Sequence, residues 1–188
     1  RRPRGGTQET TTVDLAWVRA RVTDSRFVGA AFGYGLLWCW YYVLSSQLVD
    51  VLTTGGIDAT VAATSFGTIG GVSILARVGS GFVDDRVGRR ETFLAGVLLA
   101  GLCVLVLPAV HTRVPLYVTL AGFGVSLGAL APLWSPIVVT RFGAENATAT
   151  VGLLKVPQAG AAFVAPLAVS TLFGVTGGYT VPLVVLSV

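Results

Sequence analysis

Two basic side chains lie inside long apolar runs of the sequence. Arg77 lies seven residues before Asp84, roughly 10 Å into its run, and Lys155 lies within the run of residues 147–173. A cation at the centre of a membrane span costs about 2.5–3.5 kcal/mol, so it usually faces a cavity or a partner. These residues could therefore bind an organic anion, and the planar fork of arginine suits a carboxylate. Alternatively, Arg77 snorkels to the interface or pairs with Asp84, and Lys155 snorkels too.

The residues around Arg77 favour a cavity over tight packing. Gly70, Ser73 and Gly81 share a helix face with Arg77, and all three are small. We expect this face to be a cavity wall.

Aromatic residues recur at helical spacing in the run of residues 27–52. Tyr34, Trp38 and Tyr41 lie in the middle of this run, whereas an interfacial belt would place them at its ends. They therefore either pack against other helices or line a cavity, and Trp134 in a later run is a further candidate. A cavity with one or two cations and aromatic walls suits a small organic anion.

The composition indicates that the elements positioning these residues are membrane helices. Mean hydropathy is +0.77, 53% of residues are hydrophobic and 12% are charged, which leaves too few polar residues to cover a soluble surface. A membrane helix needs about 20 mostly apolar residues. The sequence provides such runs, the last incomplete, at about 27–52, 59–83, 92–110, 115–140, 147–173 and 180–188. We predict an all-α polytopic membrane helical bundle.

The ends of the sequence suggest a longer protein. It contains no methionine, and Val188 falls inside the sixth run. We therefore expect an internal fragment, with residues 1–26 as a polar cytoplasmic segment and residues 27–188 as a transmembrane bundle.

The distribution of basic residues predicts the orientation. Ten Lys and Arg residues lie on the side of the first segment, in residues 1–26, 84–91 and 141–146. Only Arg113 lies on the other side, in residues 53–58, 111–114 and 174–179. Cytoplasmic loops carry the excess of basic residues. We therefore expect a multi-pass protein of the plasma or inner membrane with a cytoplasmic N-terminal segment.

The stretch GSGFVDDRVGRR at residues 79–90 carries a recognisable spacing. It resembles the signature loop of the major facilitator superfamily, G-x-x-x-D-R-x-G-R-R/K. The order of the runs around it resembles the second half of such a transporter: the central cytoplasmic loop, helices 7 to 11 and a truncated helix 12. The resemblance implies that the missing N-terminal half is a partner, and that the loop is a conformational latch formed by Gly81, Asp85, Arg86, Gly88, Arg89 and Arg90.

Two segments resemble one branch of that superfamily more closely. ARVGSGFVDDRVGR, residues 76–89, is similar to helix 8 of the oxalate:formate antiporters and monocarboxylate porters, and Arg77 matches the arginine that binds the substrate carboxylate there. FGAENATATVGLL, residues 142–154, resembles the stretch leading into helix 11. In the oxalate transporters a lysine follows six residues after the glycine of that stretch, but this position is Gln158 here, and Lys155 lies one turn earlier. The resemblance therefore implies an anion on Arg77, with Lys155 or Gln158 contributing.

The sequence shows no motif for proton-carrying acidic residues within the spans, for ATP binding or for a metal site. The apolar runs hold no deep acidic residue and no phosphate-binding loop, and the single histidine, His111, lies in an outer loop without a metal-ligand cluster. The arginines of residues 1–26 are better explained by a cytoplasmic linker than by nucleic-acid binding. We therefore expect a secondary transporter of a small mono- or dicarboxylate in the lipid bilayer, without cofactor or metal and not an enzyme. The alternatives are a carrier of another substrate class (sugar, drug or nitrate) and a non-transporting sensor of the same fold.

Overall fold

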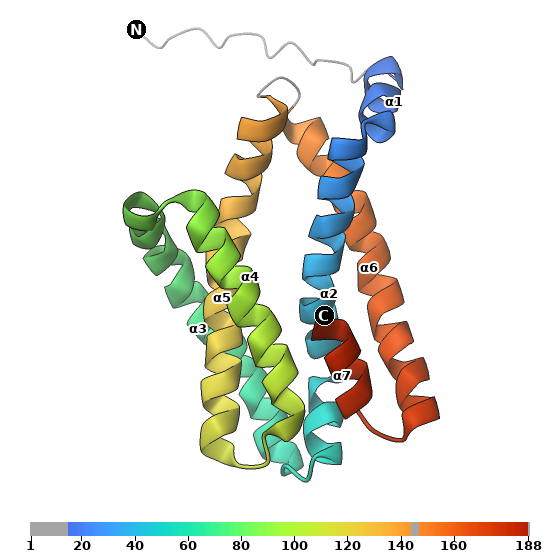
Figure 1. The fold of residues 1–188 in the computed structure, drawn as a ribbon. Helices are drawn as coiled ribbons and strands as arrows, with labels where there is room; N and C mark the ends of the chain where they lie inside the picture. The colour runs from blue at the N-terminus through green and yellow to red at the C-terminus, as the bar shows by residue number, and fades with distance from the viewer. Residues whose placement is uncertain (1–14, 144–146, 188) are drawn as a thin grey trace, which may run out of the picture.

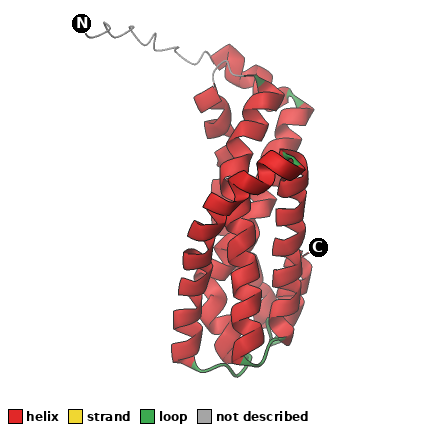
Figure 2. Ribbon diagram, turned by 90° about the vertical axis from the view of Figure 1, so that its left-hand side faces the viewer, coloured by secondary structure: helices red, strands yellow, loops and turns green. Residues whose placement is uncertain are grey.

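The computed structural model describes residues 15–143 and 147–187, and this part of the chain is a helical bundle without a strand (Figures 1 and 2). Its helices are α1 (Leu15–Thr23), α2 (Ser25–Thr54), α3 (Ala59–Val87), α4 (Arg89–Val106), the 3-10 turn η1 (Leu107–Ala109), α5 (Arg113–Phe142), α6 (Ala147–Thr176) and α7 (Thr180–Ser187). Five of them, α2, α3, α4 with η1, α5 and α6, are long and apolar enough to cross a membrane. This confirms the predicted all-α polytopic bundle.

Short polar side chains and glycines set the helix ends. The Asp24 side chain accepts a hydrogen bond from the Arg26 N–H (3.0 Å) and so caps α2. Asp58 does the same for α3, accepting from the Thr60 and Val61 N–H groups (3.0 and 3.2 Å). Each carboxylate satisfies N–H groups that have no partner within the helix.

The charged stretch that we expected to be a loop at residues 84–91 is almost entirely helical. Helix α3 runs to Val87 and α4 starts at Arg89, so Gly88 alone makes the turn. Gly88 has φ +109° and ψ 147°, a conformation open essentially only to glycine. The charges therefore lie on the last turn of one helix and the first turn of the next.

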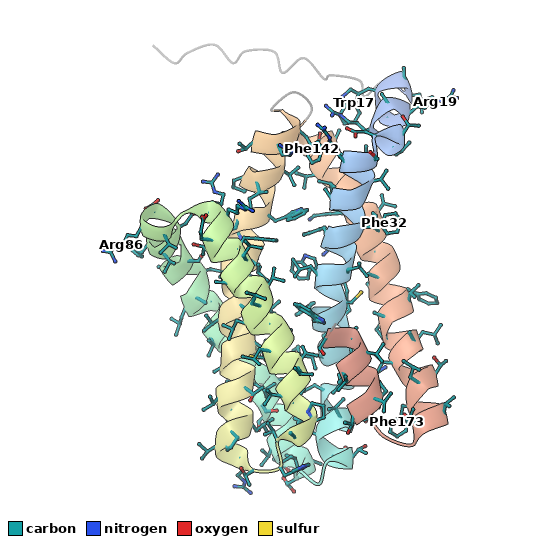
Figure 3. All side chains as sticks on the ribbon, in the orientation of Figure 1. Trp17, Arg19, Phe32, Arg86, Phe142 and Phe173 are labelled. Atoms are coloured by element: carbon teal, nitrogen blue, oxygen red, sulfur yellow. The ribbon has the colours of Figure 1, made fainter. Side chains whose placement is uncertain are left out.

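The N-terminal segment also contains a helix that we did not predict. The guanidinium of Arg21 in α1 lies over the Trp17 ring at 5.6 Å and donates to the Phe142 carbonyl at 3.3 Å. Because Phe142 is the last residue of α5, this bond satisfies a carbonyl that has no partner within its helix. This bond ties α1 to the end of α5, where Phe142 is labelled in Figure 3.

The five long helices form two groups (Figure 1). In one group α3 and α4 both pack on α5, and in the other α2 packs on α6. A larger core toward the end of the bundle that holds Gly55 and His111 joins the groups through buried residues such as Val43, Leu116 and Phe123. A smaller core at the opposite end contains Phe27, Ala31, Val138 and Leu154.

Glycines decide where backbones meet. A Cβ built on Gly128 would lie 2.5 Å from the Ser73 carbonyl oxygen and 2.5 Å from the Ala76 Cβ, and one on Gly124 would lie 2.8 Å from the Ile69 carbonyl oxygen. This GxxxG pair therefore seats α3 directly against α5.

The GxxxG pairs Gly29/Gly33 on α2 and Gly67/Gly71 on α3 have no such role in the described chain. A Cβ at Gly29, Gly33, Gly67 or Gly71 would meet nothing within 4 Å. These glycines leave smooth, uncovered strips on α2 and α3.

Candidate functional site

The cations proposed to bind substrate lie at similar depths in their helices. Arg77 lies ten residues before the end of α3 at Val87, about 15 Å along the axis. Lys155 lies eight residues after the start of α6 at Ala147, about 12 Å, and Gln158 one turn deeper. Both helices have these ends on the same side of the bundle (Figure 1). Each cation therefore lies about two to three turns inside the end of its helix on this side of the bundle.

Arg77 lies beside the contact between α3 and α5. A Cβ on Gly128 would lie 3.1 Å from the Arg77 backbone nitrogen, but the Arg77 side chain is exposed. Within residues 15–143 and 147–187 it takes part in no salt bridge. Asp84, the alternative partner we considered, instead accepts from the Arg89 Nε at 3.4 Å. The Arg77 side chain is thus exposed, although its backbone lies beside the helix contact.

The expected cavity wall on α3 is only partly uncovered. Gly70, Arg77 and Gly81 are exposed, whereas Ser73 is 9% exposed and its hydroxyl donates to the Gly70 carbonyl (2.8 Å). The expectation that Ser73 lines a cavity is therefore wrong, because its carbonyl lies against Gly128 in the contact between α3 and α5.

Lys155 and Gln158 belong to the other helix group. Lys155 is exposed and Gln158 is half-buried on α6. Helix α6 packs on α2, where a Cβ on Gly35 would lie 3.1 Å from the Pro157 carbonyl group. The cations thus come from separate helix groups.

The predicted aromatic residues pack against one another. Trp134 of α5 stacks on Tyr34 of α2, with ring centroids 4.3 Å apart, and Tyr34 meets Trp38 edge-on at 6.0 Å. Trp38 in turn meets Tyr41 at 5.5 Å, and Phe93 of α4 meets Trp134 at 5.8 Å. This aromatic ladder connects the two helix groups, so packing is at least part of its role.

One atom of the ladder is left without a partner. The Trp134 Nε1 donor is buried and makes no hydrogen bond in the described part of the chain. A buried indole N–H usually finds an acceptor.

The latch residues line the exposed corner at which α3 turns into α4. Gly81, Asp85, Arg86, Arg89 and Arg90 are all exposed, and Gly88 forms the turn between the helices. Figure 3 shows Arg86 projecting outward from this corner. One oxygen of the neighbouring Asp84 is buried without a partner among the described residues.

Sequence reasoning missed Gln47, which ties the two helices of one group together. The Gln47 Nε2 donates to the Pro166 carbonyl (2.7 Å) and to the Ser170 hydroxyl (3.0 Å), and its own carbonyl oxygen is buried without a partner in the described chain. An amide inside an apolar run was the signal that could have found it. Phe93 offered no signal, because its ring only becomes part of the ladder through folding.

Residues 15–143 and 147–187 contain no group of three or more His, Cys, Asp or Glu side chains able to hold a metal ion. No protein-family model matches the chain. The chain is 27% identical over 157 residues to MFS transporter asaE of Aspergillus flavus, and the alignment covers 82% of this chain and 35% of that protein. The chain thus spans about a third of the length of this curated relative. With five membrane-length helices, this similarity supports membership of the major facilitator superfamily of membrane transporters.

Proposed function

We propose that this chain is the second half of a secondary active transporter that moves a small organic anion, a mono- or dicarboxylate, by alternating access. The similarity to a major facilitator transporter supports a carrier in general. The choice of an anion rests on the polar side chains inside the apolar helices, Arg77, Lys155 and Gln158.

The observation that carries the anion assignment is Arg77. Its guanidinium is exposed about 15 Å from the end of α3 and has no ion pair in the described chain. A charge at that depth of a bilayer is costly unless something neutralises it. A carboxylate would do so with two parallel N–H···O bonds.

A second polar group would distinguish substrates. Lys155 supplies a second cation at similar depth and Gln158 a neutral amide, both on the opposite helix group. A dicarboxylate would use Arg77 and Lys155 together, whereas a monocarboxylate needs only Arg77. Tyr34, Trp38, Tyr41 and Trp134 would form the aromatic wall of this site.

Alternating access requires the other half of the transporter. Two halves rock around a site near the bilayer midplane. The exposed charges of the α3–α4 corner, Asp85, Arg86 and Arg90 among them, would bind helix ends of that half in one state and release them in the other. In this proposal the corner faces the cytoplasm, in the plasma or inner membrane, because it lies on the side rich in arginine.

The test is counterflow in proteoliposomes made with the full natural protein that contains this chain. Unlabelled carboxylate is loaded inside, and uptake of labelled formate, lactate, pyruvate and oxalate is followed. We expect saturable exchange that falls roughly 10–150-fold in Arg77→Ala, the range of a hydrogen bond to a charged group. Arg113→Ala, at the opposite end of the bundle, is the matched control and should exchange normally.

Two results would contradict the proposal. Exchange of neutral substrates but not of carboxylates would replace the anion by another substrate class. Normal carboxylate exchange by Arg77→Ala would show that this arginine does not bind the substrate. Saturable exchange of oxalate but not of formate or lactate, lost in Lys155→Ala, would identify a dicarboxylate carrier.

A further inference from the structure

Helices α2 and α4 leave an apolar groove between them on the side of the bundle where α7 lies (Figure 1). This α2–α4 groove runs along α2 from Trp40 to Ala30 and along α4 from Leu105 to Phe93, and it has a volume of about 900 Å³. We propose that the groove holds the chain that follows Val188 in the full protein, which continues α7 as a helix. This inference rests on the proposed function only in taking the chain as part of a longer transporter.

Helix α7 already enters the groove. Its last residues, Val185, Leu186 and Ser187, form part of the groove wall. The Trp40 Nε1 on α2 donates to the Leu186 carbonyl at 2.6 Å, and a Cβ on Gly101 of α4 would lie 3.8 Å from the Ser187 carbonyl oxygen. The end of α7 is therefore held between the two walls of the groove, with α2 on one side and α4 on the other.

The direction of α7 carries a continued helix along the groove. Helix α7 starts at the loop after α6 and runs antiparallel to α2 and α4 (Figure 1). The bond from Trp40 does not stop the helix, because a carbonyl oxygen has two lone pairs. Leu186 can therefore accept both from Trp40 and from the N–H group four residues later in an α-helix.

The length of the groove matches what α7 lacks as a membrane helix. Helix α7 has eight residues and is about 12 Å long. From Trp40 to Ala30 the groove continues for ten residues of α2, about 15 Å. Together these lengths give about 27 Å, close to the roughly 30 Å hydrocarbon core that a membrane helix crosses.

The groove lining suits the apolar side of a helix. Most of its side chains are leucine and valine. The Ser187 hydroxyl and the Cys39 thiol donate within their own helices, to the carbonyls of Val184 (2.8 Å) and Gly35 (3.6 Å). Gly33 lies in the α2 wall, and a Cβ there would meet nothing within 4 Å in the described chain. A glycine at such a position lets a second helix backbone approach closely.

A helix in the groove would also cover one side of the aromatic ladder. Phe93 and Trp134 belong to the ladder, and both line the groove. The continued helix would therefore separate this side of the ladder from the lipid.

The contacts of α7 define the register of the continued helix. Gly33 lies seven residues before Trp40, and Leu94 lies seven residues before Gly101. Because α7 is antiparallel to both helices, the residues seven positions beyond Leu186 and Ser187 reach the levels of Gly33 and Leu94. These are about the fifth and sixth residues after Val188.

The experiment uses the full natural protein in lipid vesicles, with the photoreactive substitution Leu94→p-benzoylphenylalanine. After illumination, cross-linked peptides are mapped by mass spectrometry. We expect a cross-link to a residue about four to eight positions after Val188. The same substitution at Leu102, which lines the groove where α7 lies, should cross-link to residues 185–187 as the positive control. At Val78 of α3, which is 68% exposed but does not line the groove, it should give neither cross-link.

Matched variants test whether the cross-linked segment lies in the groove. Gly33→Leu fills the groove and should reduce the Leu94 cross-link at least about fivefold, the lower end of the cost of overpacking. Gly29→Leu adds the same side chain at the other open glycine of the pair, outside the groove, and should leave the cross-link unchanged. If Gly33→Leu fails to fold, Val97→Phe, which narrows the groove from α4, replaces it.

Three outcomes would overturn the proposal. Cross-links from Leu94 to lipid alone would mean that the bilayer fills the groove. Cross-links to a distant part of the protein or to a second copy would assign the groove to another occupant. A cross-link after Val188 that persists in both Gly33→Leu and Val97→Phe would place that segment outside the groove. Because no readout involves transport, a failure of carboxylate counterflow in the same protein would overturn the proposed function alone.

Discussion

The contact between α3 and α5 gives the sharpest prediction, because a single added methyl group must separate the helices. In Gly128→Ala the new Cβ would lie 2.5 Å from the Ser73 carbonyl oxygen and 2.5 Å from the Ala76 Cβ. Carbon atoms pack best at about 3.5–4.0 Å. The helices must therefore move apart by about 1 Å at this point, since a backbone carbonyl cannot rotate away.

The expected loss of stability follows from two opposing terms. Overpacking costs about 1–3 kcal/mol, and the upper end applies here because one clashing atom is backbone. Alanine gains up to about 1 kcal/mol over glycine in helix propensity. Gly128→Ala should therefore lower the free energy of unfolding by about 2 kcal/mol, or the Tm by roughly 4–8 °C for a chain of this size.

Gly71→Ala is the matched control. Gly71 lies on the same pair of helices, but its Cβ would meet nothing within 4 Å. This variant should gain up to about 1 kcal/mol from helix propensity alone. The two variants should therefore differ by about 3 kcal/mol, or roughly 6–12 °C.

The assay is thermal unfolding in detergent with a thiol-reactive fluorescent dye. Cys103 is 8% exposed and Cys39 is half-buried, so the reactivity of both thiols rises on unfolding, most of all that of Cys103. Neither cysteine belongs to α3 or α5. If Gly128→Ala melts at the same temperature as Gly71→Ala, the close approach of the helices is refuted.

Three further predictions use the same melting assay. Gly88→Ala should lose about 1–3 kcal/mol, because φ +109° strains any other residue and its Cβ would lie 2.6 Å from the Glu91 Oε2; an unchanged Tm would contradict the glycine-specific turn. Gln47→Ala should lose about 2 kcal/mol, from two hydrogen bonds worth about 0.6 kcal/mol each in a bilayer and a small cavity; Gln47→Leu fills the cavity and should recover about 0.8 kcal/mol, whereas equal loss in both variants would assign the effect to the hydrogen bonds alone. Burial, and to a lesser extent the charge of Asp50, raises the pKa of Tyr179 above its ordinary 10.0. The contribution of Tyr179 to stability is therefore complete below pH 10 and is lost as the pH rises through the folded-state pKa. Tyr179→Phe should remove this part of the alkaline loss of stability, and identical pH profiles of the two proteins would refute the reasoning.

The helices could be predicted from the sequence because the signals that form them are local. A run of about 20 apolar residues specifies a membrane helix wherever it lies. Asp24 and Asp58 mark helix starts through bonds to backbone only two or three residues away. The observed ends lie within about four residues of the predicted runs.

The candidate site could be predicted only in part. Arg77 and Lys155 stand out because a charge inside an apolar run is visible in the sequence itself. Phe93 could not be found, since its ring meets Trp134, which in turn stacks on Tyr34, only once three helices meet.

The sequence alone determined the apolar runs, the cations within them, the glycine at the charged corner and the arginine-rich side. The tertiary structure decided which glycines carry helix contacts. Gly124 and Gly128 meet α3, whereas Gly67 and Gly71 show the same spacing but meet nothing in the described chain. Spacing defines which face of a helix is smooth, but contact also needs a second backbone at that face. That backbone comes from residues about 50 positions away, and only the packing of the whole bundle places it there.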